Sequence, residues 1–297
     1  MTYLPPWPVL LCRRRNRVRV IAVFARRDGR LEPMAEMSAA SVGSYLRQAF
    51  AVGAAEVQKL RHDPFELFTR AIQPVLWLVL FGEVMERSHG LTSGGLDYLD
   101  FLAAGILSQS VLFVAIFYGI AAIWERDLGI LHRYLVSPTP RSALVLGKAA
   151  SAGVRGLSQS VVVYILAMLL GVAVSLAPLH LIGMALLIVL GAGLFSTLSL
   201  IIACLVKTRE RFMGIGQVIT MPIFFASNAI YPLEIMPVWL RILSRANPLT
   251  YEVDALRALM IRGASSVFGI GTDFAVLVVG FGILVMVAAR LYGRMGS

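Results

Sequence analysis

The residues best suited to specific chemistry form one polar segment, Trp124 to Lys148, which lies between two long apolar stretches. Its ionic side chains are Glu125, Arg126, Asp127, His132, Arg133, Arg141 and Lys148. Leu128, Leu131 and Leu135 recur at spacings of three and four residues, which places them on one face of a short helix. Pro138 and Pro140 end that helix. A helix with one apolar and one charged face can dock into a groove of another protein. The pattern predicts a partner-binding helix; an ordinary solvated loop is the alternative.

The sequence disfavours other kinds of chemistry in this chain. Gly147-Lys148 is followed by Ala149 where a phosphate loop has Ser or Thr, and Ser142 stands where its first Gly is needed. Cys12 and Cys204 are too far apart to indicate a disulfide or metal framework. No nucleic-acid-binding motif accompanies the net charge of +10. We therefore expect no ATP site, cofactor, metal or nucleic-acid partner for this chain itself.

The elements that position the segment are predicted to be membrane-spanning helices. Hydrophobic residues make up 58% of the 297 residues and charged residues only 15%, and the mean hydropathy is +0.78. A helix crosses the hydrocarbon with about 20 apolar residues. Six stretches fit, and they are too continuous to be barrel strands: Phe65–Met85, Phe101–Ile123, Gly153–Ala177, Leu179–Val206, Phe212–Tyr231 and Phe274–Ala289. Transporters driven by ions carry ionisable groups inside their spans; the interiors of these stretches hold none.

The distribution of Lys and Arg predicts the orientation. With both termini inside, 22 of the 27 Lys and Arg lie on the inner side, since only Arg87, Arg241, Arg245, Arg257 and Arg262 fall outside. Basic residues near spans are retained in the cytoplasm. The distribution thus predicts a multi-pass membrane protein with both termini in the cytoplasm, whose basic surface meets anionic lipids. The excess of 24 Arg over 3 Lys is typical of a bacterial genome, so the membrane expected is the bacterial plasma (inner) membrane.

The part before the first span divides in two. Residues 1–40 are Arg-rich and lack helical periodicity, which predicts a disordered extension, and Met34 or Met37 is as suitable a translation start as Met1. From Ser41 to His62, apolar residues recur at helical spacing, which predicts an amphipathic helix in the membrane interface or one packed on the spans. Asp63-Pro64 then caps the first span. We expect residues 41–297 to form one transmembrane domain.

Two blocks of residues resemble the ABC-2 type permeases. These are the membrane subunits of ATP-binding-cassette exporters of drugs, polysaccharides and nodulation-type lipids. The first block is Glu125-Arg126-Asp127-x-Gly129-x-Leu131-x-Arg133-x-Leu135-x-Ser137-Pro138, followed by Arg141 and Gly147-Lys148. The second is Tyr231-Pro232-Leu233, Pro237-x-Trp239-Leu240, Asn247-Pro248-Leu249-Thr250-Tyr251 and Asp254-x-Leu256-Arg257. With the six spans, the resemblance covers about Ser41 to Arg290. Many relatives have Glu, Thr and an acid where this chain has Asp127, Ile130 and His132.

The resemblance implies roles for particular residues. In the family the first block is the cytoplasmic coupling helix between spans 2 and 3, which contacts a separate ATPase that holds ATP and Mg²⁺. Its expected contacts here are Glu125, Arg126, Leu128, Leu131, Arg133, Leu135 and Arg141. The second block implies short re-entrant helices before span 6, with Pro232, Asn247, Pro248, Asp254 and Arg257 in an outer lid. Asp254 and Arg257, three residues apart, can pair on one helix face.

The substrate path is predicted from side-chain type. Aromatic, Met and uncharged polar groups can repack around varied apolar ligands, although the same residues also serve interhelix packing. The candidates are Gln109, Phe113, Phe117, Tyr118, Met221, Phe224, Phe225, Asn228 and Tyr231. Small residues such as Gly191, Gly193 and Ser196 predict close helix approach. The family arrangement implies a homodimer, or a heterodimer with a related permease.

The sequence therefore predicts an all-α integral membrane permease of an ABC-2 exporter. It would move an amphipathic or lipophilic, drug-like or antibiotic-like compound outward. Export of a polysaccharide or lipid-linked glycan is the alternative within the family. An ion-coupled carrier and a membrane anchor or assembly factor without transport are the alternatives from other classes.

Overall fold

A computed structural model describes residues 24–27, 30–33, 72–82, 84, 97–128, 141–206 and 208–291. The chain divides into two compact units, Met1–Arg47 and Gln48–Ser297. In the first unit, strands β1 (Phe24–Arg27) and β2 (Arg30–Pro33) pair antiparallel, with Phe24 opposite Pro33. Two short strands thus lie where the sequence predicts a disordered extension. The predicted domain boundary between residues 40 and 41 stays a prediction.

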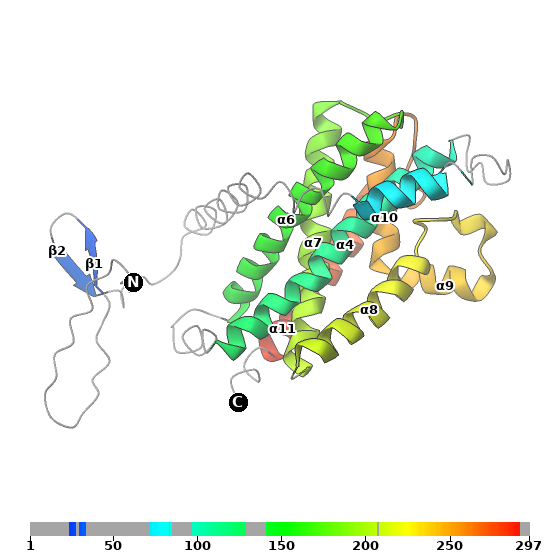
Figure 1. Cartoon of the computed structure of the whole chain (residues 1–297). Helices are drawn as coiled ribbons and strands as arrows, with labels where there is room; N and C mark the ends of the chain where they lie inside the picture. Colours follow the sequence, from blue (N-terminus) through cyan, green and yellow to red (C-terminus); the bar gives the residue numbers. More distant parts are fainter. Residues whose placement is uncertain are drawn as a thin grey trace, which may run out of the picture. The chain divides into compact units, whose positions relative to one another are not determined.

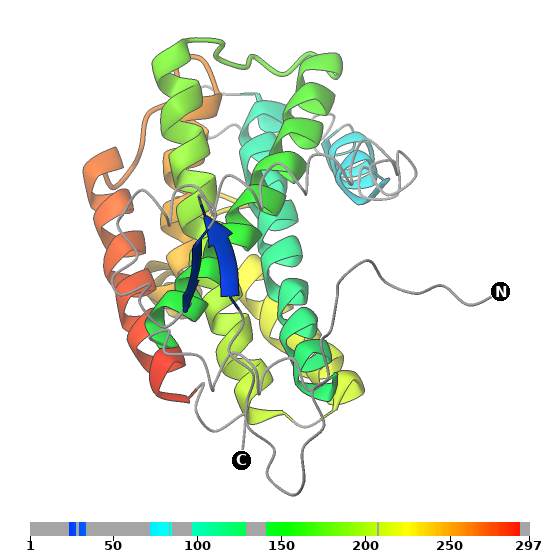
Figure 2. The ribbon, with the colours of Figure 1, turned by 90° about the vertical axis from the view of Figure 1, so that its left-hand side faces the viewer.

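The described part of the second unit is helical. Its long helices are α4 (Tyr98–Asp127), α6 (Arg141–Leu169), α7 (Pro178–Leu205) and α11 (Ile270–Leu291). All four are long and apolar enough to cross a membrane. Figures 1 and 2 show α4, α6 and α7 side by side, with α11 beside α7. The chain is therefore a helical membrane protein.

Shorter helices complete the described bundle. An apolar helix covers Ile72–Gly82 and ends in the π-helical turn η2 (Trp77–Gly82). α8 (Arg209–Phe225) follows α7 directly, and η3 (Leu233–Ile235), α9 (Val238–Ala246) and α10 (Pro248–Met260) lead to α11. The first predicted span is described only in part, and α8 has 17 residues. The prediction of six spans is thus neither confirmed nor contradicted.

The helices alternate in direction, so the bundle has two ends. The end where α4 finishes at Asp127 and α6 starts at Arg141 is called here the ionic end. The end where α4 and α11 start, near α9 and α10, is called the short-helix end.

The third predicted span is displaced in the structure. We predicted Gly153–Ala177, whereas α6 runs from Arg141 to Leu169. It stops early because Gly171 has a φ of +85°, a left-handed conformation that glycine adopts without strain. The Gly171 N–H donates to Met168 O and the Val172 N–H to Ala167 O, which closes the last turn. Val174 then pairs with Ile261, and this short bridge fastens the α6–α7 connection to the end of α10.

Close packing depends on small residues in α4 and α7. At Gly105 in α4, a β-carbon would overlap the backbone of Ala229. In α7, Gly191, Gly193 and Ser196 are buried, as their small size led us to expect. The Ser199 hydroxyl donates to the carbonyl of Ile116, which ties α7 to α4 inside the bundle.

Candidate functional site

The ionic end joins α4 to α6 through a salt bridge. Lys148 Nζ, near the start of α6, lies 2.5 Å from Glu125 Oε2 in the last turn of α4. The side chains of Lys148 and Glu125 are 16% and 28% exposed, so solvent screens this pair less than a fully exposed pair. The bridge fastens together the two helices that flank residues 129–140.

The last turn of α4 is also tied to α7 and α8. Arg126 Nη1 donates to Val206 O, at the C-cap of α7, over 3.0 Å. Arg209 Nη2, at the start of α8, lies 3.1 Å from Asp127 Oδ2. The Arg209 guanidinium also lies 4.5 Å from the centre of the Trp124 ring, a cation–π contact. One turn of helix thus contacts three neighbouring helices, and a movement of this turn is passed to all of them.

The structure describes part of the predicted coupling segment. Glu125 and Arg126 belong to the end of α4 itself, and Leu128 is its C-cap residue with 68% of its surface exposed. Arg141 begins α6. Leu131, Arg133 and Leu135, together with His132, lie outside the described residues. The ion pairs join Glu125 to Lys148, and Asp127 to both Arg126 and Arg209. The prediction named none of these contacts.

The predicted path residues separate into packed and partly open groups. Gln109, Asn228 and Phe224 are buried in the bundle at 2%, 2% and 0% exposure. Phe113 and Phe117 pair along α4 with ring centres 6.1 Å apart and are only partly covered, as are Tyr118, Met221 and Tyr231. Phe225 is 42% exposed at the end of α8. The second group is therefore accessible without unpacking the bundle.

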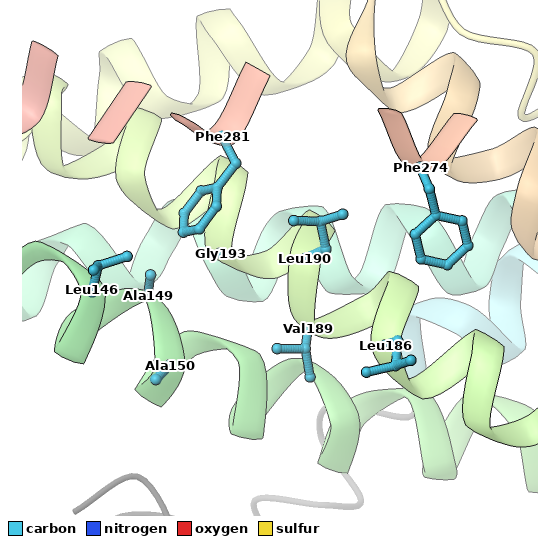
Figure 3. A pocket seen from close by; sticks show the side chains of 9 residues that line it. All are labelled: Leu146, Ala149, Ala150, Leu186, Val189, Leu190, Gly193, Phe274 and Phe281. Atoms are coloured by element: carbon cyan, nitrogen blue, oxygen red, sulfur yellow. The ribbon is translucent and has the colours of Figure 1, made fainter. Parts of the chain in front are cut away.

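An apolar crevice lies on a different side of the bundle. It has a volume of about 460 Å³, a size typical of small-molecule sites. Its lining comes from α6, α7 and α11, as Figure 3 shows: Leu146, Ala149, Ala150, Leu186, Val189, Leu190, Gly193, Phe274 and Phe281. None of the predicted path residues is among them.

Arg155 lies in a place that the sequence did not indicate. We assigned it to the cytoplasmic segment because it carries a charge, but it lies halfway along α6, inside a helix long enough to span the membrane. Its guanidinium lies 5.0 Å from the centre of the Tyr118 ring of α4. This cation–π contact joins the middle of α6 to the predicted path. The unbroken helical pattern upstream of Gly153 was the signal that could have shown that this helix starts earlier.

At the short-helix end, Asn247 and Pro248 start α10. Asn247 Oδ1 accepts the Leu249 N–H at 3.0 Å as an N-cap, and Pro248 occupies the first turn. The Asn247 amide also donates to Ile223 O in the last turn of α8, at 2.6 Å. Pro232 is buried before η3. The predicted lid residues therefore connect α8 to α10.

Asp254 and Arg257 bind different partners. Arg257 donates to Asn228 O at 2.8 Å and stacks 3.6 Å above the ring of Phe101 at the start of α4. Asp254 accepts the backbone N–H of Val267, at 2.7 Å, in the loop before α11. α10 thus fastens the beginnings of two long helices and the turn after α8. Arg257 and Asp254 are almost fully buried.

Glu252 is a buried acid that the sequence analysis did not single out. Its carboxyl is fully buried and lies against Gly191 of α7, where a β-carbon would overlap it. Ser108 of α4 faces it, yet neither carboxyl oxygen has a hydrogen bond of good geometry within the described residues. Burial of a charge without a partner is costly, so this group is held as a neutral acid.

The model of the ABC-2 type transporter domain matches residues 47–261. The chain belongs to the ABC-2 type transporter family. Within this family the chain is similar to permeases of several organisms. The putative transport permease ycf38 of Cyanophora paradoxa is 26% identical over 278 residues, which are 91% of this chain and 95% of the relative.

Two further relatives of this ABC-2 protein have more specific names. The daunorubicin resistance ABC transporter permease protein DrrB1 of Streptomyces coeruleorubidus is 23% identical over 78% of this chain and 81% of its own length. Nodulation protein J of Rhizobium leguminosarum bv. trifolii is 28% identical over 64% of this chain and 71% of its own length. The chain is therefore a membrane subunit of the ABC transporter class, as the two blocks of residues led us to expect.

Proposed function

We propose that this ABC-2 permease exports an amphipathic or lipophilic, drug-like compound, driven by ATP hydrolysis in a separate ATPase subunit. The observation that carries the proposal is the connection of the last turn of α4 to α6, α7 and α8 at the ionic end. A partner that pushes on residues 124–148 would move all of these helices together. ATP and Mg²⁺ would be bound by that partner, since this sequence has no phosphate loop.

The proposed cycle is conformational. Closure of the ATPase would tilt α4 and α6, and the short-helix end would have to loosen for a compound to leave. Arg257 and Asn247 hold that end closed through backbone carbonyls of the α8 region. The excess of Lys and Arg near the ionic end supports a cytoplasmic position for it, so that the short-helix end would face outward. The membrane would be the plasma membrane of a bacterium.

A drug-like compound is favoured over a glycan by the side chains available. The partly open predicted path residues are mostly aromatic, and no acid stands among them. The relative DrrB1 is named for daunorubicin resistance, which makes daunorubicin a suitable probe. A second copy of the chain, or a related permease, would complete the path by facing α4 and α8.

The test is ATP-dependent transport in inverted membrane vesicles that contain the permease and its ATPase. We expect daunorubicin fluorescence to be quenched on adding ATP, and the quenching to survive an uncoupler that collapses ion gradients. Phe225→Ala should alter the rate, while Ile283→Ala, an exposed position on α11, should not. Transport that needs an ion gradient and no ATP would support a secondary carrier instead. An assembled complex that moves neither daunorubicin nor a lipid-linked glycan would support an anchor.

A further inference from the structure

Two buried acids meet at one hydroxyl between α10 and α11. Asp254 on α10 is 1% exposed and Asp273 in the first turn of α11 is 0% exposed. Ser266, in the loop between the helices, lies with its Oγ 2.9 Å from Asp254 Oδ2 and 2.8 Å from Asp273 Oδ2. Both distances are those of hydrogen bonds. The second oxygen of each acid is buried and has no hydrogen bond within the described residues.

Counting hydrogens shows that this arrangement contains an additional proton. A serine hydroxyl has one hydrogen and can donate it to one acceptor. The Gly269 N–H donates to Ser266 Oγ at 2.7 Å, which leaves this oxygen one further lone pair to accept with. The two contacts to carboxyl oxygens are both satisfied only if one acid is protonated and donates to Ser266, while Ser266 donates to the other. Two ionised carboxylates would leave one contact without a hydrogen.

The surroundings decide which acid carries the proton. Asp254 Oδ2 also accepts the backbone N–H groups of Val267 at 2.7 Å and Phe268 at 3.1 Å. The positive charge of Arg257 acts on it as well. A proton on Asp254 Oδ2 would point at N–H donors that already face this oxygen. Asp273 has no such donors among the described residues, so Asp273 is the acid that holds the proton.

Other titratable groups of the packed elements are engaged elsewhere. On α4, Asp100 accepts the Ala173 N–H, and on α7 the His180 ring bonds Ser175. In the loop itself, Arg262 donates to Val174 O. On α10, Glu252 faces Ser108. Among the described residues, Asp254 is the titratable group that faces Asp273, through the hydroxyl of Ser266.

We propose that Asp254, Ser266 and Asp273 form a proton-binding site that joins α10 to α11 while Asp273 is protonated. Loss of this proton leaves two carboxylates facing one hydroxyl, and their repulsion loosens the joint. α10 also holds the start of α4 and the turn after α8. The closed state of the short-helix end therefore becomes dependent on pH. This inference goes beyond the proposed transport function and does not require that the substrate is known.

The experiment uses the full-length permease in lipid nanodiscs, titrated from acidic to alkaline pH. Infrared difference spectra should contain the carbonyl band of a protonated carboxylic acid that disappears as the pH rises and that is absent in Asp273→Asn. The melting temperature of the wild-type protein should fall over the same pH range, because the folded state then binds one more proton than the unfolded state. In Asp273→Asn, whose amide also donates to Ser266, this fall should be lost.

Controls separate this site from other acids and from cations. Glu252 is a second buried acid, so the titration is repeated in Glu252→Gln, where the band of Asp273 and its part of the fall in melting temperature should remain. If Asp273→Asn does not fold, Ser266→Ala serves in its place and should shift the band of Asp273 without abolishing it. A titrating band that persists when Asp273→Asn is combined with Glu252→Gln would overturn the proposal. A melting temperature that depends on added Na⁺ or Ca²⁺ but not on pH would also overturn it, because a cation would then bridge the carboxylates.

Discussion

Glu125 and Lys148 form an ion pair that joins the end of α4 to the start of α6. Both residues flank the segment that we propose to receive the push from an ATPase. The pair, with Arg126 on the C-cap carbonyl of α7, makes the ionic end a single mechanical unit. A force on the connecting segment is therefore passed to several long helices at once.

Breaking this ion pair should uncouple ATP hydrolysis from transport more than it destabilises the fold. Lys148→Met leaves Glu125 without its partner, and we expect a loss of about 1 kcal/mol in stability, typical of a partly exposed pair. Transport per ATP hydrolysed should fall several-fold. The double exchange Glu125→Lys with Lys148→Glu should restore part of it. If the double exchange lost as much transport per ATP as Lys148→Met does, the ion pair would not be what couples hydrolysis to transport.

Arg257 should not be replaceable by lysine. Its guanidinium donates to Asn228 O and stacks on Phe101, a geometry that a lysine ammonium does not reproduce. We expect Arg257→Lys to cost about 1.5–3 kcal/mol, the range for a lost hydrogen bond of a charged group. Thermal unfolding in detergent measures it. Arg245→Lys on the exposed part of α9 is the matched control and should have little effect; equal effects of both would contradict the role of Arg257.

The contact between α4 and the turn after α8 leaves no room at Gly105. A β-carbon there would overlap the carbonyl of Ala229. Gly105→Ala should destabilise the protein by about 1–3 kcal/mol, as overpacking does. Gly214→Ala, where nothing lies within 4 Å of the added carbon, should instead stabilise α8 by about 0.5–1 kcal/mol. Melting curves that rank the two variants in the opposite order would show that α4 does not pack on this turn.

Asn247 should contribute more than an ordinary helix cap. Asn247→Ala removes both the cap of α10 and the bond to Ile223 O, so we expect a loss above the typical ~1 kcal/mol of a cap. Thr208→Ala removes the exposed cap of α8 and should cost less. Limited proteolysis at the short-helix end would report the loosening. A protease pattern unchanged in Asn247→Ala would mean that the α8 to α10 connection does not depend on this side chain.

Apolar patterning predicted the helical membrane fold, and the family resemblance implied the region of short helices, but apolar patterning located helix ends less well. Phe101–Ile123 and Leu179–Val206 are close to α4 and α7 because uninterrupted apolar residues define both. The third span was displaced because Arg155 was read as a loop residue and Gly171 was not read as a helix stop. Charge inside a helix is tolerated where an aromatic ring such as Tyr118 covers it.

The sequence predicted which segments hold the site residues, but not which side chains those residues contact. Asp254 and Arg257 have the spacing of a pair on one helix surface. In the structure, Arg257 instead contacts α4 and the turn after α8, and Asp254 contacts the loop before α11. Glu252 is fully buried although its segment carries several other charges, and Gly191 of α7 lies against its carboxyl. Sequence spacing reports neighbours along one helix; these side chains depend on neighbours from elsewhere in the chain.

The central claim is that a separate ATPase drives this permease through the segment next to the ionic end. The most direct test is to purify the tagged protein from its native membranes in mild detergent and identify what accompanies it by mass spectrometry. We predict an ATPase with a phosphate loop in equal amount, lost in Leu131→Asp, which places a charge in an apolar contact, and retained in Leu131→Met. Absence of any such ATPase in several detergents, or its full recovery with Leu131→Asp, would contradict the account.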